Sequence, residues 1–166
     1  MAQVDYFLNI DGISGESQDK DHAGTIEIDS WSWGESNFGG GTSGGGAGRG
    51  RVSLQDLKVT AHTNKASPEL MLACASGKHL SKAVLYCRKA GGEQFDFLTF
   101  QFTTVIVSTF DVVGSHGTSS TDEVIPTDQF SLNFAKIEMI YKERPASGGD
   151  LITVDEFVDT RPNANT

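Results

Sequence analysis

The chain contains 166 residues, 37% of them hydrophobic, which is enough for one sizeable core and short for two. Its formal net charge is −9 at pH 7, which argues against non-specific nucleic-acid binding, because that binding depends on Lys and Arg side chains that neutralise phosphates. Two cysteines, Cys74 and Cys87, are too few for a disulfide framework. We therefore expect a single domain over residues 1–166, with both cysteines as buried thiols in a reducing compartment.

The N-terminal region is acidic and begins with an alternating segment. Residues 1–35 carry one Lys against eight Asp and Glu residues. Apolar side chains occupy every second position from Val4 to Ile10, which predicts a strand that Asp11-Gly12 ends. The first residues lack a basic region followed by an apolar stretch, so we predict no cleavable signal peptide. No apolar run in the chain approaches the length of a membrane span.

The second predicted strand changes phase along its length. Ile26 and Ile28 share one face, whereas Trp31 and Trp33 fall on the other, so the inward phase flips near Ser30. Two tryptophans at i and i+2 of a strand are more often core residues than an exposed sugar-binding platform. We therefore expect both indole rings to face the core.

A glycine-rich run follows the tryptophans. Eight of the nineteen glycines fall between Gly39 and Gly50, and we assign residues 36–50 to a long extended loop. Such a segment cannot bury enough apolar surface to fold on itself. In a compact domain, a structureless loop of this length is either a disordered spacer or an arm that works against something outside the subunit. Composition leaves both possibilities open.

Two later strands show the same phase change. The apolar residues of each form two groups of opposite parity: Phe95 and Phe97 against Leu98, Phe100 and Phe102, and then Phe130, Leu132 and Phe134 against Ile137, Met139 and Tyr141. A bulge can keep such side chains in the core, or both strand faces are buried, one of them against a neighbouring subunit. Closing a small barrel requires bent, bulged strands. We therefore predict a mainly β fold: a small closed β-barrel of bent antiparallel strands.

One short α-helix is predicted to pack on the side of this barrel. Ser67 can cap it, Pro68 suits its first turn, and Glu69 suits the positive end of its dipole. The apolar stretch 70–75 continues it, and Gly77 can end it in a left-handed conformation. At two to three turns, it is too short to stand alone.

The remaining segments are shorter. Arg88–Glu93 predicts a hairpin, because its two glycines tolerate the positive φ angles of a tight turn. Residues 114–128 predict a polar loop. The tail over residues 143–166 carries one apolar patch, Leu151–Val154, and a final strand near Phe157-Val158.

Several catalytic patterns occur in the glycine run, and we attribute them to chance. Gly39–Gly44 satisfies GxGxxG and Gly41–Gly45 satisfies GxSxG, but a predicted strand follows where both motifs require a helix. The four histidines lack the short spacings of a metal site. We therefore predict no catalytic residue, cofactor or metal, and expect that the protein is not an enzyme.

These segments together resemble the Hcp family, the tube proteins of bacterial type VI secretion. The resemblance covers about residues 4–142. It rests on these segments: 6–12, 15–17, 22–24, the Ile28–Gly34 block with its Trp-Ser-Trp-Gly sequence, the glycine-rich loop, Ser67–Met71, Cys74–His79, Arg88–Gly92 and Leu132–Ala135. Where many members carry a Gly-Trp pair in the tail, this chain has Glu156-Phe157.

The resemblance implies a hexameric ring that stacks on other rings into a tube. A contractile sheath fires such a tube, tipped by a spike protein, from a baseplate into another cell, and the ring lumen carries small effector proteins. The implied partners are therefore the chain itself, spike, sheath, baseplate and effectors, with no nucleic acid and no membrane insertion. The implied location is the bacterial cytoplasm during assembly, followed by secretion without a cleavable signal peptide.

The resemblance also implies two contact regions. Ser32 lies on the strand face opposite to Trp31 and Trp33, and that face lines the lumen in the family, so Ser32 is the expected effector contact. The glycine-rich loop reaches a neighbouring subunit or ring, where its arginines could meet the acidic N-terminal region. The expected loop contacts are Gly39, Gly40, Gly41, Thr42, Ser43, Gly44, Gly45, Gly46, Ala47, Gly48, Arg49 and Arg51.

Two alternatives from other classes stay open at this point. A carbohydrate-binding β-module would be a monomer with exposed tryptophans. A hydrolase would use Ser43 as its nucleophile. The native mass separates the tube subunit from the first alternative, because a hexamer has six times the mass of the 17.8 kDa chain.

Overall fold

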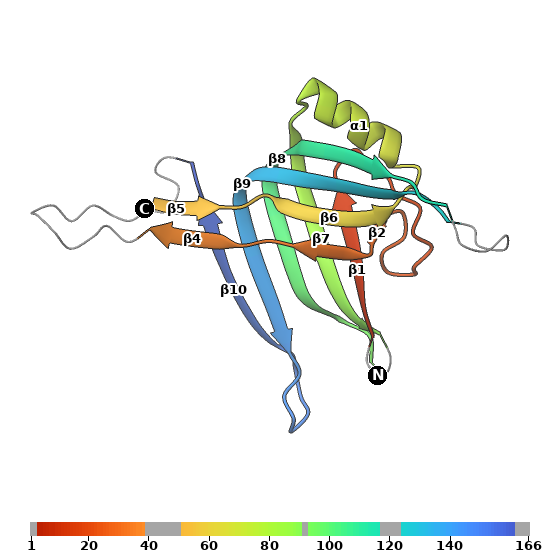
Figure 1. The fold of residues 1–166 in the computed structure, drawn as a ribbon. Helices are drawn as coiled ribbons and strands as arrows, with labels where there is room; N and C mark the ends of the chain where they lie inside the picture. The colour runs from red at the N-terminus through yellow and green to blue at the C-terminus, as the bar shows by residue number, and fades with distance from the viewer. Residues whose placement is uncertain (1–2, 39–50, 91–92, 117–123, 162–166) are drawn as a thin grey trace, which may run out of the picture.

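The computed structural model describes residues 3–38, 51–90, 93–116 and 124–161. Its described part is mainly β, with one helix lying across one end of the strands (Figure 1). The elements in chain order are β1 Gln3–Ile10, β2 Ile26–Ile28, β3 Ser30–Ser32, β4 Glu35–Phe38, β5 Arg51–Leu54, β6 Leu57–His62, α1 Ser67–Ser76, β7 Leu80–Ala90, β8 Asp96–Val113, β9 Thr127–Glu143 and β10 Ile152–Asp159.

One antiparallel sheet forms most of the molecule. Its strands follow the order β2-β1-β7-β8-β9-β6-β3, and β10 pairs with the C-terminal part of β9. The two end strands, β2 and β3, are consecutive in the chain. Between them Asp29 donates its backbone N–H to the carbonyl of Thr60 on β6, at 2.9 Å. The sheet therefore curls into a nearly closed barrel, as the phase flips predict.

The long strands β8 and β9 change their inward face together. Phe102 and Val105 are both buried although their parities differ, and the same holds for Phe134 and Ile137 on β9. Between the first two lies Thr104, whose φ of 55° is left-handed. The register of β8 against β9 is unchanged across this point, so a local bend and not an inserted residue turns both strands. The flip predicted on β9 between Phe134 and Ile137 is confirmed, but no bulge causes it. The accompanying flip on β8 between Phe102 and Val105 was not predicted.

Two true register shifts occur elsewhere in β8. One lies opposite the step from Cys87 to Arg88 on β7, where Leu98 and Asp96 are the successive partners and Phe97 is the extra residue. The second lies between Val107 and Thr109. The first is the bulge expected between Phe97 and Leu98.

The core fills the space between the two layers of the barrel. Its largest fully buried side chains come from six different strands and from the helix: Phe102, Leu8, Ile10, Ile26, Leu57, Leu70, Leu85, Leu132 and Val105. Each such side chain contributes about 1.5–3 kcal/mol when fully buried. Cys87 is also buried, and burial raises the pKa of its thiol to about 12. Cys74 is only partly buried, and both cysteines are free.

Helix α1 begins and ends much as predicted, except for its cap. Gly77 takes a left-handed conformation with a φ of 63° at the C-terminal end. The N-cap is Ala66, so the prediction that Ser67 caps the helix is wrong. The Ser67 hydroxyl instead donates to Asp128, which also accepts a hydrogen bond of 2.7 Å from Thr63. A fully buried carboxylate thus ties the start of the helix to β9.

Three other predicted segments differ in their limits. Strand β9 begins at Thr127, so Asp128 belongs to the sheet and not to the polar loop. Strand β10 joins the two predicted apolar pieces of the tail into one strand. Residues 36–38, predicted as loop, form most of β4, which pairs with β5 as a separate two-stranded arm. In Figure 1 this arm projects to one side of the barrel.

The loop between β1 and β2 is held against the outside of the barrel. Arg88 on β7 is buried and donates two hydrogen bonds to Asp19, at 2.7 and 2.6 Å. His22 is buried between the rings of Phe7 and Tyr86, and its Nε2 lies 2.9 Å from Asp96. These contacts fix a polar, acidic segment that has few apolar side chains of its own.

Candidate functional site

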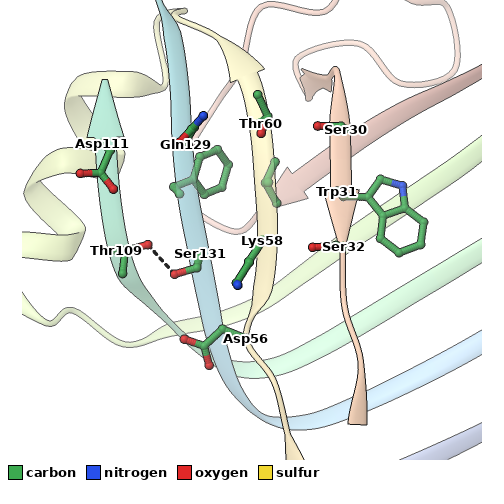
Figure 2. Close-up of a pocket in the computed structure, with 12 residues that line it drawn as sticks. Ser30, Trp31, Ser32, Asp56, Lys58, Thr60, Thr109, Asp111, Gln129 and Ser131 are labelled. Carbon is green, nitrogen blue, oxygen red and sulfur yellow. Dashed lines mark hydrogen bonds between the residues drawn. The ribbon is translucent and has the colours of Figure 1, made fainter. Parts of the chain in front are cut away.

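Four neighbouring strands present a polar face on the side of the sheet opposite to the core. The strands are β3, β6, the N-terminal part of β9 and the C-terminal part of β8 (Figure 2). Strand register aligns the side chains in two cross-strand rows, Ser32–Lys58–Ser131–Thr109 and Ser30–Thr60–Gln129–Asp111. With Asp56, these residues line a shallow hollow that we call the polar wall.

Alternation along each strand explains why this face is polar. Ser30 and Ser32 lie on one side of β3 and Trp31 on the other (Figure 2). The Trp31 ring packs edge-on against Phe100 and Tyr6, with centroid distances of 5.3 and 6.0 Å. Trp33, farther along the chain, also packs against the core. The prediction that both indoles are core residues is confirmed, and neither forms an exposed sugar-binding platform.

Hydrogen bonds stiffen one end of the polar wall. The register shift after Val107 brings the hydroxyls of Ser108 and Thr109 to 2.7 and 2.6 Å from the hydroxyl of Ser131. Ser108 also lies 2.6 Å from one carboxylate oxygen of Asp56, and Asn133 donates to the other at 2.8 Å. These contacts hold the side chains in place before any partner binds.

Lys58 is the cation at the centre of the polar wall. Its neighbours across the strands are Ser32 and Ser131, and its side chain is exposed. Among the described residues, no carboxylate oxygen forms an ion pair with its ammonium group within 4.0 Å. Lys58 and the surrounding hydroxyls can therefore donate hydrogen bonds to polar groups of another molecule.

The wall has the chemistry of a binding surface. Hydroxyl, amide, carboxylate and ammonium groups line it, and no histidine is among them. Over the described parts of the chain, no three His, Cys, Asp or Glu side chains gather where they could hold a metal ion. The described helix is too short and too polar to cross a membrane.

Of the predicted contact residues, the structure describes only Ser32 and Arg51. Ser32 is exposed and lies in the wall. Arg51 begins β5, with its backbone paired to Phe38. The other predicted loop contacts, Gly39 to Arg49, and Ser43 with them, lie outside the described residues. The partners of Ser32 in the wall were not predicted from the sequence: Ser30, Lys58, Thr60, Thr109, Asp111, Gln129 and Ser131. Their only signal was alternation with core residues, which any solvent-facing strand also shows.

Comparison with known proteins assigns the family. The profile of the family described as "Type VI secretion system effector, Hcp" matches residues 7–141. Protein hcp1 of Pseudomonas aeruginosa is 42% identical over 146 residues, which are 87% of each chain. The chain belongs to the Hcp family.

Solved structures of Hcp proteins have the same fold. Hcp1 from Salmonella typhimurium matches with a TM-score of 0.74 and 34% identity, over 96% of each chain. A type VI secretion system effector from Yersinia pestis matches with a TM-score of 0.73 and 29% identity, over 93% of this chain and 99% of its own.

Family membership carries a coarse function with it. As an Hcp protein, the chain is a structural tube subunit of a type VI secretion system and not an enzyme. Hcp proteins are secreted and assemble with copies of themselves. The resemblance inferred from the Trp-Ser-Trp-Gly block and the helix is therefore confirmed, and the carbohydrate-binding module and the hydrolase are set aside.

Proposed function

We propose that this Hcp chain forms hexameric rings whose polar wall lines the lumen, and that the rings stack into the inner tube of the secretion system and carry effectors. The observation that carries this proposal is the polar wall itself, eight side chains in two rows over four strands. A lumen that holds a folded protein and later releases it needs a wet surface with many weak polar contacts and few apolar ones. The opposite face of the same strands is the apolar core.

Ser32→Gln is expected to lower effector retention about tenfold without dissolving the ring. The longer amide side chain would project from the wall next to Lys58, and a tenfold loss corresponds to about 1.4 kcal/mol. The measurement is the amount of an effector protein of the producing bacterium that co-purifies with the ring, together with the native mass of the ring. Ser76→Gln, at an exposed position on α1, is the matched control. Unchanged retention in Ser32→Gln would remove Ser32 from the lumen.

We further propose that the β4–β5 arm makes the contact between rings or neighbouring subunits. An isolated two-stranded hairpin is marginally stable in water, so an arm of this kind gains from a partner surface. Glycine also permits close backbone approach. The proposed contacts are the loop residues named above, with Arg49 and Arg51 directed at the acidic N-terminal region of the neighbour.

Deleting Gly39 to Ala47 is expected to leave the barrel intact and to weaken stacking. Strands β4 and β5 lie outside the deletion, and the core of the described residues is built from the other strands and the helix. The measurement is the length distribution of tubes by electron microscopy, with ring mass and melting temperature as controls. Tubes of unchanged length would make the loop a spacer.

The finer partners and location follow from the same proposal. A tube of these rings would be tipped by a spike protein and enclosed by a contractile sheath on a baseplate. The subunit would form one domain over residues 1–166, assemble in the bacterial cytoplasm and leave without cleavage of a signal peptide.

A further inference from the structure

Two of the carboxylates at the polar wall already have partners within the chain. Asp56 accepts a hydrogen bond on each of its oxygens, 2.6 Å from the hydroxyl of Ser108 and 2.8 Å from the amide nitrogen of Asn133. The Asp29 carboxylate, directly before β3, lies 2.8 Å from Nδ1 of His62. A cationic group of another molecule would have to share these contacts or displace them.

Lys58 has no such partner among the described residues. Asp56 precedes it by two positions, but the hydrogen bonds from Ser108 and Asn133 hold that carboxylate toward β8 and β9, and no ion pair forms within 4.0 Å. Asp111, the other carboxylate of the wall, lies on β8, and β9 separates it from β6. Two strand spacings place it about 10 Å from Lys58 across the sheet. The ammonium group therefore keeps its donors for another molecule.

The groups beside Lys58 can donate hydrogen bonds as well. Figure 2 shows the hydroxyls of Ser30 and Ser32 pointing from β3 toward β6, and register places Thr60 next to Ser30. Within the described part of the chain, these three hydroxyls form no hydrogen bond. A carboxylate can accept several hydrogen bonds from such a cluster and is attracted by the ammonium group, whereas a cation is repelled by it. The β3–β6 half of the wall thus favours an anionic group.

We infer that the polar wall selects effectors that present carboxylate side chains, and that Lys58 makes this selection. The inference rests on the proposed lumen and names the chemical class of surface that the lumen holds. In the proposed hexameric ring every subunit contributes one Lys58, so an effector inside meets several ammonium groups at once. Each exposed ion pair is weak by itself, which suits a cargo that has to be released.

The negative charge of the whole chain does not remove this preference. The net charge is −9, but eight of the acidic residues lie in residues 1–35, and four of those line a different groove beside β1 and β2: Asp5, Asp19, Glu27 and Asp29. At physiological ionic strength the screening length is about 8 Å, so charges beyond that distance act weakly on a partner in contact with Lys58. Long-range repulsion slows the approach of an acidic partner, whereas the groups in contact decide how firmly it is held.

Short fluorescent peptides of repeating Glu-Gly, Gln-Gly or Lys-Gly units test this preference on the purified protein by fluorescence anisotropy. The Glu-Gly peptide is expected to bind more tightly than the Gln-Gly peptide, and its binding should weaken as salt is added. An exposed ion pair contributes up to about fivefold in affinity, so Lys58→Met should weaken Glu-Gly binding about tenfold when the peptide meets two such groups. Lys58→Arg keeps the charge and should stay within about twofold of the wild type. The matched control is Lys82→Met, at an exposed position on β7 outside the wall, and it should bind like the wild type.

The native mass of each variant, measured by analytical ultracentrifugation, separates this inference from the proposed ring. Glu-Gly binding that is equally tight in Lys58→Met and in the wild type would overturn the role of Lys58. A Lys-Gly peptide that gains affinity in Lys58→Met and loses it in Asp111→Asn would show that the wall selects cationic partners, which also overturns the inference. A monomeric wild type that still binds the Glu-Gly peptide through Lys58 would overturn the ring and support the preference of the wall.

Discussion

Replacing Arg88 with Met is expected to reduce the free energy of unfolding by about 3 kcal/mol at neutral pH, at the lower end of the range for breaking a buried ion pair. The Arg88 guanidinium donates two hydrogen bonds to Asp19 and lies 3.5 Å from Asp5. Without it, the carboxylates of Asp5 and Asp19 lose the guanidinium that pairs with both of them. Urea unfolding measures the loss, and Lys82→Met, at an exposed position on the same strand, is the control.

The same pair predicts a specific acid sensitivity. Hydrogen bonds from Arg88 lower the pKa of Asp19 from 3.8 to about 2. Because the folded-state pKa lies below the ordinary value, the pair stabilises the protein fully above about pH 4 and loses this effect as the pH falls toward 2. The difference in stability between wild type and Arg88→Met should therefore shrink over that interval. A difference that stays constant down to pH 2 would show that Asp19 is not the partner that matters.

Gly15→Ala is expected to destabilise the chain by about 3 kcal/mol, the upper end for overpacking, and to release the loop between β1 and β2. A Cβ atom at this position would lie 2.3 Å from the backbone oxygen of Thr25, and the backbone cannot move aside like a flexible side chain. Gly15 also donates its N–H to the carbonyl of Gly24 at 2.9 Å, so the two loop segments run close together.

Thermal unfolding and hydrogen exchange of the loop amides measure this effect. Gly114→Ala is the matched control, because a Cβ atom there meets nothing within 4 Å. Equal melting temperatures for the two variants would mean that the loop rearranges at little cost. If the loop opens while the barrel stays folded, exchange should increase at His22 and Thr25 but not in β8.

Parity along the strands predicted much of the barrel. Phe134 and Ile137 can both reach one core only if β9 turns over between them, and both are buried in the structure. The matching turn of β8 at Thr104, between Phe102 and Val105, was not predicted. The helix was predictable for local reasons, since Pro68 fixes φ in the first turn and Gly77 tolerates the left-handed conformation that ends the helix. The cap at Ser67 was not, because a carboxylate 61 residues away competes for its hydroxyl.

The sequence by itself therefore determined the strand periodicity, the phase changes, the helix limits and the family. It did not determine the polar wall, because Ser32, Lys58 and Ser131 become neighbours only through the register of three strands. Nor did it separate the exposed Met139 and Tyr141 from the buried core residues that precede them in the same pattern. Periodicity states which face a side chain takes, whereas burial depends on what lies across from that face, and only the tertiary structure decides that.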